Sequence, residues 1–352
     1  MRTYTIDMIA GDGIGQEVAP AAVDCIDAIA ARHDFRIDWR VRDWGSDRYF
    51  ADGAMMPADG LDQLRDGDGI FLGAVGHPEI DDTVTLWGLL IPIRRAFQQY
   101  LNIRPVRLLP GISPRVMKNA EIDLVIVREN VEGEYSEVGG RAYEGTPDAM
   151  AFQQSLFTKR GITRVAAFAA ELAATRRGRL ISATKSNGLL HSMPFWDEIV
   201  AETVAGVPGV ELESVLIDAL AARMVLAPDS VDVIVASNLF GDILSDLAAA
   251  VAGSIGVAPS ANVNPDRTMP SMFEPVHGTA PDIVGTGRAN PVGQLWAGAM
   301  MLDHLGETAG ALALRTAFEQ ALADGVRTPD LGGDASTTEF ADEVVRRIRT
   351  HS

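Results

Sequence analysis

The sequence predicts an α/β protein of two domains, and three observations support this prediction. The chain has 352 residues, which is more than one ordinary hydrophobic core contains. Short runs rich in β-branched residues alternate with segments of helical spacing, which is typical of parallel sheets covered by helices. Hydrophobic residues make up 47% of the chain and charged residues 22%, as in a soluble globular protein.

The predicted elements follow this alternation from the N-terminus. Residues 3–9, TYTIDMI, form a predicted strand, and the apolar residues from Val18 to Ile29 then recur at helical spacing. A later helix is expected to start near Gly241 and run through Val251, where SNLFGDILSD leads into an apolar run. The other runs that read as strands are 35–41, 68–75, 122–129, 179–185, 215–218 and 231–238.

Charge and cysteine content exclude several classes of function. The net charge of −18 argues against binding to nucleic acid or to an anionic membrane. Cys25 is the one cysteine, so no intramolecular disulfide can form, which fits a reducing cytoplasm. The N-terminus lacks the apolar core of a signal peptide, and the apolar stretches are broken before they could span a membrane. We therefore expect a cytoplasmic protein.

Two segments depart from the regular alternation. Residues 129–160 are rich in glycine and charge and then alternate like strands, which predicts either a surface loop or an arm that pairs with another chain. Residues 11–15, GDGIG, lack the last glycine of a dinucleotide fingerprint, because Gln16 stands at that position. We expect a glycine-rich turn between strand and helix there, with a secondary role near a ligand.

Basic residues suggest an anion site. Arg94, Arg95, Arg104, Arg107 and Arg128 are expected at strand ends and turns, where α/β proteins bind ligands. Guanidinium groups bind carboxylates bidentately, so a small carboxylate ligand is one interpretation. Scattered surface salt bridges are the alternative.

Lysine is rare in this chain, which makes each lysine informative. Of 30 basic residues only three are lysine, namely Lys118, Lys159 and Lys185. Lysine can act as a base and arginine cannot, and Lys185 at the end of a predicted strand is the best candidate for such a role. Tyr135 follows EGE, and on its own it reads as a structural residue.

Acidic residues suggest a metal site. Asp242 and Asp246 are four residues apart, so their carboxylates share one face of the predicted helix. They could compensate the helix dipole, or they could hold a divalent cation. Asp218, at the end of a predicted strand, could cap a helix or supply a third ligand.

The segment 274–291, EPVHGTAPDIVGTGRANP, is predicted to be a long loop. Its His277 has an ordinary structural interpretation. A loop so rich in glycine could also wrap a flat ligand, with Asp282 available to a ribose diol.

Together these segments resemble the β-decarboxylating dehydrogenases, the family of isopropylmalate, isocitrate, tartrate and D-malate dehydrogenases. The resemblance covers essentially the whole chain and is carried by GDGIG, NIRP, VREN, NLFGDILSD and HGTAPDIVGTGRANP, in that order. The segment TLWGLLIPIRRAFQQYLNIRPVRLLPG is most similar to the tartrate and D-malate branch.

The resemblance implies an isopropylmalate dehydrogenase-like fold, with two α/β domains around a central cleft in a non-Rossmann arrangement. Residues 1–101 and 252–352 would form a large domain with the cofactor-binding loop. Residues 102–251 would form a small domain with the dimer interface, and the segment 129–160 would be a clasp arm. A homodimer or higher homo-oligomer with shared active sites is therefore expected.

The resemblance also implies the roles of individual residues. Tyr135 and Lys185 match the catalytic tyrosine and lysine, and the lysine would act across the dimer. The residues that match the substrate-binding positions are Arg94, Arg104, Arg128 and Asn187. The residues that match the ligands of Mg²⁺ or Mn²⁺ are Asp242, Asp246 and, from a second subunit, Asp218. The residues that match the loop for the adenosine part of the cofactor are His277, Gly278, Thr279, Ala280, Asp282 and Asn290.

The implied activity is NAD- and divalent-metal-dependent oxidative decarboxylation of a small 2-hydroxy diacid. A monovalent cation such as K⁺ is a further cofactor to be considered. NADP-dependent relatives carry Lys-Tyr where this chain has Asp282 and Ile283, so NAD is expected. A non-catalytic regulatory subunit is the alternative of a different class, and intact Tyr135 and Lys185 count against it. A kinase or ligase that uses GDGIG as a phosphate loop would need G-x-x-x-x-G-K-[ST], which is missing.

The residues before Arg94 suggest the substrate. The stretch 89–93 offers no hydroxyl donor for the extra carboxylate of isocitrate, and an unpaired buried charge is costly. Trp87 would add bulk beside the same pocket, which disfavours the isopropyl group. We therefore expect D-malate, oxidised and decarboxylated to pyruvate, with tartrate also a substrate and 3-isopropylmalate as the alternative.

Overall fold

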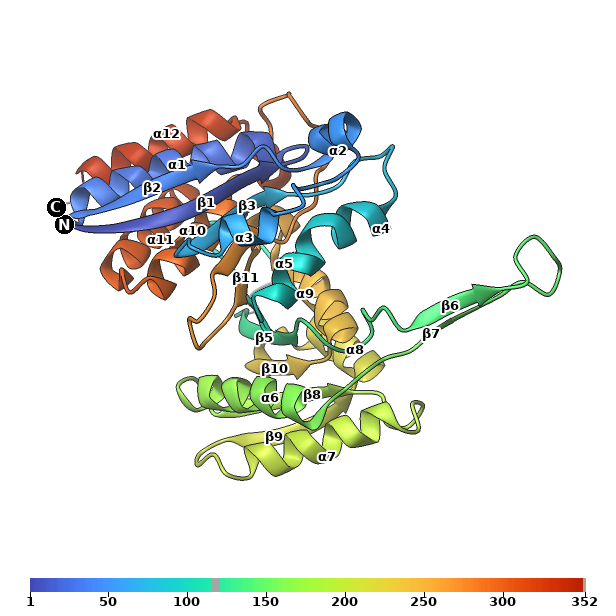
Figure 1. Ribbon diagram of the computed structural model, residues 1–352. Coiled ribbons are helices and arrows are strands. Elements are labelled where there is room, and N and C mark those ends of the chain that lie inside the picture. Colours follow the sequence, from blue (N-terminus) through green and yellow to red (C-terminus); the bar gives the residue numbers. More distant parts are fainter. Residues whose placement is uncertain (115–120, 351–352) are drawn as a thin grey trace. The chain divides into compact units, whose positions relative to one another are not determined.

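The chain folds into two compact α/β units. The computed structural model describes residues 1–114 and 121–350, and Lys118 lies outside these ranges. Unit 1 consists of the described residues of Met1–Gln99, Arg107–Lys118 and Ala249–Ser352. Unit 2 consists of the described residues of Tyr100–Val106 and Asn119–Ala248 (Figure 1). The mixed α/β class predicted from the sequence is confirmed.

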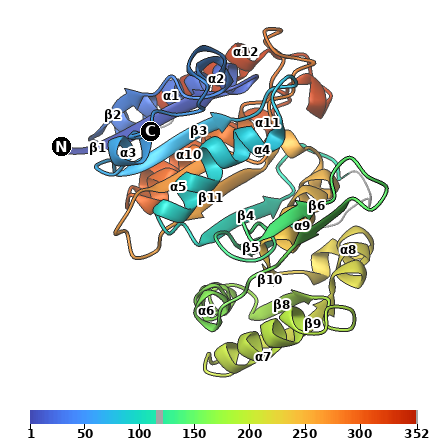
Figure 2. The ribbon, with the colours of Figure 1, turned by 45° about the vertical axis from the view of Figure 1, so that its right-hand side comes forward.

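Unit 1 is built on a mostly parallel sheet with strand order β2-β1-β3-β12-β11. β1 pairs in parallel with β2 and β3, β3 pairs in parallel with β12, and β11 pairs antiparallel with β12. Helices α1 and α12 lie side by side, as do α10 and α11 (Figures 1 and 2). The strands of unit 1 are β1 (Arg2–Gly11), β2 (Phe35–Val41), β3 (Gly69–Ala74), β11 (Pro259–Val263) and β12 (Ser271–Pro275). Its longer helices are α1 (Gly15–Arg32), α2 (Ser46–Asp52), α5 (Ile91–Ala96), α10 (Val292–His304), α11 (Thr308–Ala323) and α12 (Thr337–Thr350). Its shorter helical segments are α3 (Gly60–Leu64), α4 (Asp82–Thr85), the π-helix η1 (Leu86–Leu90), η3 (Ile255–Val257) and η4 (Pro329–Leu331).

Unit 2 has strand order β4-β5-β10-β8-β9. β5, β10, β8 and β9 pair in parallel, and every residue of β10 is buried. A parallel strand covered on both faces must be apolar throughout, which explains the VIVA sequence of β10. Its strands are β4 (Leu101–Arg107), β5 (Asp123–Glu129), β6 (Gly139–Ala142), β7 (Met150–Gln153), β8 (Arg179–Thr184), β9 (Glu211–Leu216) and β10 (Val233–Ala236). Its helices are α6 (Lys159–Ala174), α7 (Ser192–Val204), α8 (Ile217–Leu226), η2 (Pro228–Ser230) and α9 (Asn238–Ala252), whose last turn lies in unit 1.

The segment 129–160 contains a separate hairpin. β6 and β7 form a two-stranded antiparallel sheet, which extends away from the helices of unit 2 as a long arm (Figure 1). Tyr143, Met150 and Phe152 of this arm are all more than half exposed. Apolar side chains on an isolated hairpin are typical of a surface that pairs with another chain.

Two element boundaries differ from the sequence-based expectation. α9 begins at Asn238, three residues before the expected start near Gly241. The helix dipole acts mainly within the first turn of a helix, and Asp242 lies beyond the first turn of α9. The interpretation of Asp242 as a residue that compensates the helix dipole therefore loses support. β9 ends at Leu216, so Asp218 does not end a strand. It lies in the first turn of α8, and the N-cap position is Leu216.

In the described part of the chain, no helix is both long and apolar enough to cross a membrane.

Candidate active site

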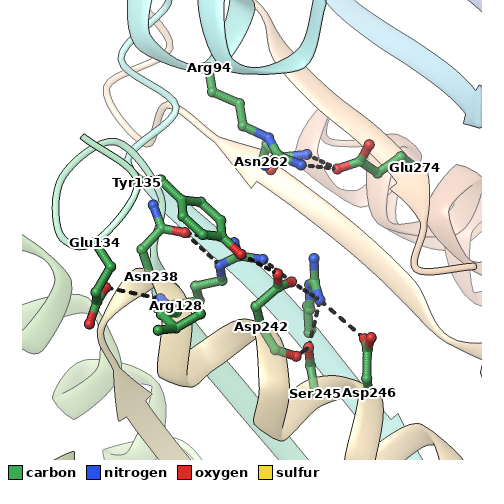
Figure 3. Close-up of polar contacts among 12 residues, drawn as sticks. Arg94, Arg128, Glu134, Tyr135, Asn238, Asp242, Ser245, Asp246, Asn262 and Glu274 are labelled. Carbon is green, nitrogen blue, oxygen red and sulfur yellow. Dashed lines mark hydrogen bonds and ion pairs between the residues drawn. The ribbon is translucent and has the colours of Figure 1, made fainter. Parts of the chain in front are cut away.

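Asp242 and Asp246 lie on one face of α9 and meet two arginines from neighbouring strands (Figure 3). Arg104 of β4 donates from Nη1 to Asp242 Oδ1 over 3.2 Å, and the same nitrogen lies 3.7 Å from Asp246 Oδ1. Arg128 of β5 donates from Nη1 to Asp242 Oδ1 over 2.5 Å. Both arginine side chains are buried, whereas that of Asp246 is 57% exposed. The pair of carboxylates thus remains open to solvent beside two buried positive charges.

Arg128 is held in place by α9 itself. Its Nε and Nη2 donate to Asn238 Oδ1 over 3.0 and 2.6 Å, which leaves Nη1 directed at Asp242. Gly241 makes this approach possible, since a Cβ at that position would lie 2.6 Å from Arg128 Cβ and Cγ. The arginine was expected at a strand end, and it is the next-to-last residue of β5.

Two other arginines are not where the sequence suggested. Arg94 lies in helix α5 and Arg104 lies inside β4, so neither stands at a strand end or turn. Arg107, the last residue of β4, forms an ion pair with Glu319. The burial of Arg94 and Arg104 argues against a role in scattered surface salt bridges.

Tyr135 reaches the same aspartate from the segment between β5 and β6. Its hydroxyl donates to Asp242 Oδ2 over 2.9 Å, and the Arg128 guanidinium lies 5.6 Å from its ring centre. Burial raises the pKa of Tyr135, and the charge of Asp242 and the hydrogen bond to it raise the pKa further. The phenol is therefore protonated at neutral pH and can act as a proton donor.

Lys185 and Asp218 form a second charged group in unit 2. Lys185 directly follows β8, as predicted, and donates from Nζ to Asp218 Oδ1 over 2.6 Å. This hydrogen bond holds the pKa of Asp218 below its usual value. Asn187 follows in an exposed turn. The described residues contain no cluster of three or more metal-ligating side chains, so one chain does not bring Asp218 to Asp242 and Asp246.

Arg94 belongs to unit 1, where it is paired with an acidic residue of β12. Its Nη2 donates to Glu274 Oε1 over 2.8 Å, and Asn262 of β11 donates to the same oxygen over 2.7 Å (Figure 3). All three residues are buried. Within residues 1–114 and 121–350, the buried Arg94 Nε has no hydrogen-bond partner.

The residues before Arg94 differ in burial, and Ile91 and Pro92 are partly exposed. Leu89, Leu90 and Ile93 pack into the hydrophobic core of unit 1 with Met55 and Phe97. The π-helix η1 and α5 turn these residues inward, and the sequence alone did not reveal that face. Trp87 is half-buried, and the Arg95 guanidinium stacks over its ring at 4.8 Å.

The loop predicted for residues 274–291 is present between β12 and α10, but it begins at residue 276, because Glu274 and Pro275 end β12. The GDGIG turn supports it: the Ile14 N–H donates to Thr279 O over 3.0 Å, and Gly11 and Gly13 adopt positive φ angles of 69° and 55°. Glu17, in the first turn of α1, accepts hydrogen bonds from the backbone N–H groups of Gly285 and Gly287 over 2.8 and 3.1 Å.

The predicted cofactor residues occupy different positions within this loop. Gly278 and Asp282 are exposed, whereas Ala280 packs against Ile14 and Val18. Burial lowers the pKa of His277, which favours an uncharged imidazole ring. Asn290 is buried, donates to Asp330 over 2.9 Å and accepts from the Val292 N–H over 3.0 Å, so its amide orders the end of the loop.

The structure thus brings Tyr135, Arg104, Arg128, Asp242 and Asp246 together, and it pairs Lys185 with Asp218 separately. Sequence reasoning missed several residues that order these groups. Asn238 lies two residues after the end of β10, with Ser237 between them. Its place just beyond a buried apolar strand is the signal that could have identified it as a candidate site residue. The other missed residues are Glu134, Ser245 and Glu274.

Comparison with known proteins fits this geometry. The family model of isocitrate/isopropylmalate dehydrogenases matches residues 5–344. The chain is 49% identical to a probable tartrate dehydrogenase/decarboxylase of Agrobacterium vitis, over 99% of this chain and 98% of the relative. It is also 49% identical to the D-malate dehydrogenase (decarboxylating) of Escherichia coli, over 99% of each chain. The crystal structure of isocitrate dehydrogenase from Methylococcus capsulatus superimposes with a TM-score of 0.90 at 33% identity, over 99% of this chain and 100% of that one.

The chain therefore belongs to the isocitrate/isopropylmalate dehydrogenase family. It is an oxidoreductase of that family. These matches confirm both the fold and the family that the sequence motifs predicted.

Proposed function

We propose that this protein is an NAD- and divalent-metal-dependent dehydrogenase that converts D-malate to pyruvate and CO₂ and also accepts tartrate. The observation that carries the proposal is the group formed by Asp242, Asp246, Arg104, Arg128 and Tyr135. It combines hard oxygen ligands, cations for carboxylates and a protonated phenol in one place. The names of the relatives, tartrate and D-malate dehydrogenases with decarboxylating activity, support the same reaction.

The carboxylates fit a divalent cation of the Mg²⁺ or Mn²⁺ type. Asp242 and Asp246 supply oxygen donors from one helix face, and such cations prefer oxygen ligands. Two carboxylates are an incomplete set, and Asp218 of a second subunit would complete it. In one chain Asp218 stands beside Lys185 instead, so both residues would reach the neighbouring site together. A monovalent cation such as K⁺ has no assigned ligands among the residues described above.

The substrate residues would divide the reaction between them. Arg94, Arg104 and Arg128 would bind the two carboxylates, because guanidinium pairs with carboxylate bidentately. When bound, NAD⁺ accepts the hydride from C2, and the divalent cation stabilises negative charge on the substrate oxygens. Lys185 would take the proton of the C2 hydroxyl. After the carboxylate on C3 has left as CO₂, Tyr135 would donate a proton to C3.

The loop 276–291 would bind the adenosine part of NAD. Asp282 is exposed on this loop, where it could accept hydrogen bonds from the ribose diol and would repel a 2′-phosphate. NAD⁺ should therefore have the higher kcat/KM, and a higher value for NADP⁺ would contradict the role of Asp282.

The functional form would be a homodimer with shared active sites. Exposed apolar side chains in unit 2 support a protein–protein interface, because a monomer leaves few large apolar side chains exposed in one region. Besides those on the arm, exposed apolar side chains lie just after Lys185, at the end of α8 and on α9. They are Leu189, Leu190, Leu226 and Ile243.

The substrate is tested by kcat/KM for D-malate, tartrate, 3-isopropylmalate and isocitrate with NAD⁺ and Mn²⁺. Since Leu89, Leu90 and Ile93 are core residues, the argument for a small substituent on C3 rests on Trp87, which Arg95 holds by stacking. D-malate should have the highest value. A higher value for 3-isopropylmalate would overturn the role of Trp87 and favour an isopropylmalate dehydrogenase.

A further inference from the structure

Glu134, the residue before Tyr135, is attached to the beginning of α9. Its Oε1 accepts a hydrogen bond from the Ser237 hydroxyl over 2.7 Å, and its Oε2 accepts one from the Leu239 backbone N–H over 3.0 Å. The first N–H groups of a helix have no partner inside the helix, and negative charge is favoured there. A carboxylate at this position therefore binds α9 through both of its oxygens.

Tyr135 is attached to the same helix one turn further along. Its hydroxyl reaches Asp242, four residues after the first residue of α9. Two consecutive residues of one segment thus contact α9 at two points: Glu134 fixes the backbone beside the helix start, and Tyr135 extends its phenol to the aspartate.

The chain on either side of this pair is bonded to other partners. Gly133 pairs with Leu156 at the base of the arm. After Tyr135, the Ser136 hydroxyl donates to Gln154 O over 2.5 Å, and the Gln153 side chain donates to Ser136 O over 2.7 Å. These bonds tie the flanking residues to the arm. Asn238 of α9 also donates from Nδ2 to Glu132 O over 3.1 Å, three residues before Tyr135. The Glu134 carboxylate adds two hydrogen bonds to the start of α9 directly beside the tyrosine.

We propose that Glu134 is a positioning residue for Tyr135. By binding Ser237 and Leu239, its carboxylate fixes the position of the tyrosine backbone relative to Asp242, and the phenol is thereby held in line for proton transfer to the substrate. This inference rests on the proposed function, in which Tyr135 is the proton donor. It adds a residue that touches neither substrate nor metal.

The first test compares Glu134→Ala with two matched variants. Glu134→Ala should lower kcat by about ten- to a hundredfold, the usual effect of a small misplacement of a reacting group, with little change in the KM for D-malate. Glu134→Gln should restore most of the kcat, because the amide can accept from the Leu239 N–H and donate to the Ser237 hydroxyl. Glu132→Ala is the control, since the Glu132 carboxylate binds Thr158 at the arm base, and it should leave kcat close to the wild-type value.

A double-mutant cycle separates positioning from general destabilisation. In a Tyr135→Phe background, Glu134→Ala should cost little further activity, because the group that it positions has been removed. Equal losses with and without the Tyr135 hydroxyl would overturn the inference. If Glu134→Ala does not fold, Ser237→Ala removes one of the two hydrogen bonds and should give a smaller loss that also vanishes in the Tyr135→Phe background.

A readout without catalysis distinguishes this inference from the proposed function. The enzyme can be labelled with 3-fluorotyrosine, and the ¹⁹F resonance of Tyr135 can be assigned by its loss in Tyr135→Phe. Glu134→Ala should shift or broaden that resonance, and Glu132→Ala should leave it unchanged. An unchanged resonance in Glu134→Ala would overturn the positioning role. Wild-type kcat in Tyr135→Phe would instead contradict the proposed acid role of Tyr135, even if the resonance moves as expected.

Discussion

The Tyr135 hydroxyl donates a hydrogen bond to Asp242 Oδ2 over 2.9 Å, while Asp242 Oδ1 accepts from Arg104 and Arg128. The proton donor and the metal-binding carboxylate that we propose are therefore in direct contact. Asp242 is stabilised by three donors, which leaves the more exposed Asp246 as the residue to change when metal binding is tested.

Asp246→Asn should weaken Mn²⁺ binding with little change in stability. The substitution is nearly isosteric at an exposed position, where changes usually alter the free energy of unfolding by less than about 0.5 kcal/mol. Binding should weaken by more than about tenfold, because even outer-shell substitutions at metal sites have effects of this size. Mn²⁺ binding can be measured by electron paramagnetic resonance, and unchanged affinity would exclude Asp246 as a ligand.

Glu17→Gln should raise the KM for NAD⁺ and leave kcat nearly unchanged. Glu17 binds the N–H groups of Gly285 and Gly287, and a glutamine retains only one acceptor oxygen for these two donors. Asp24→Asn, an exposed acidic residue on the same helix, is the control for the change in charge. If both variants have the wild-type KM for NAD⁺, the loop does not depend on Glu17.

Mixing two variants of strongly reduced activity should restore activity if subunits share residues. Tyr135→Phe and Lys185→Ala subunits would form hybrids with one intact site and one doubly altered site. A fully exchanged equimolar mixture should regain about a quarter of the wild-type activity, since half of the dimers are hybrids. Activity that stays at the level of the separate variants, after exchange has been confirmed by mass spectrometry, would show that each site is complete within one subunit.

Glu129 should make unit 2 less stable as the pH rises. Burial raises the pKa of Glu129 to about 7, against the partial compensation of backbone hydrogen bonds and Arg164, which lies 3.9 Å away. The folded state therefore retains a proton that the unfolded state loses, and stability present at acidic pH declines as the pH rises through about 7. The change is at most about 3 kcal/mol for a shift of this size.

The matching measurement is the free energy of unfolding in urea at pH 5 and pH 8. Glu129→Gln keeps an acceptor for the Val131 and Glu132 N–H groups and cannot ionise, so it should show a smaller decrease between these pH values than the wild type. An equal decrease in both proteins would mean that Glu129 is ionised throughout this range.

The sequence predicted those parts of the protein that are determined by local pattern. Apolar runs such as residues 231–238 identified the buried strands, and the order of motifs identified the family. The spacing of Asp242 and Asp246 correctly placed both carboxylates on one helix face, because the spacing of a helix determines which side chains share a face.

Contacts between distant segments could not be predicted in this way. The sequence did not indicate that Leu89, Leu90 and Ile93 face the core, since η1 and α5 rotate that stretch and no polar residue marks its inner side. The sequence did not predict the hydrogen bond between Arg128 and Asn238 either, because 110 positions separate the two residues along the chain. Such contacts depend on how β5 and β10 pair, which only the folded chain defines.

We propose that this protein couples oxidation at C2 of D-malate to loss of the carboxylate on C3. The most direct test is to incubate the protein with D-malate, NAD⁺ and Mn²⁺ and to quantify NADH, CO₂ and pyruvate together. We expect the three products to form in equal amounts and none to form without Mn²⁺. NADH formed without CO₂, or no NADH from D-malate under conditions in which another hydroxy acid is oxidised, would contradict this coupling.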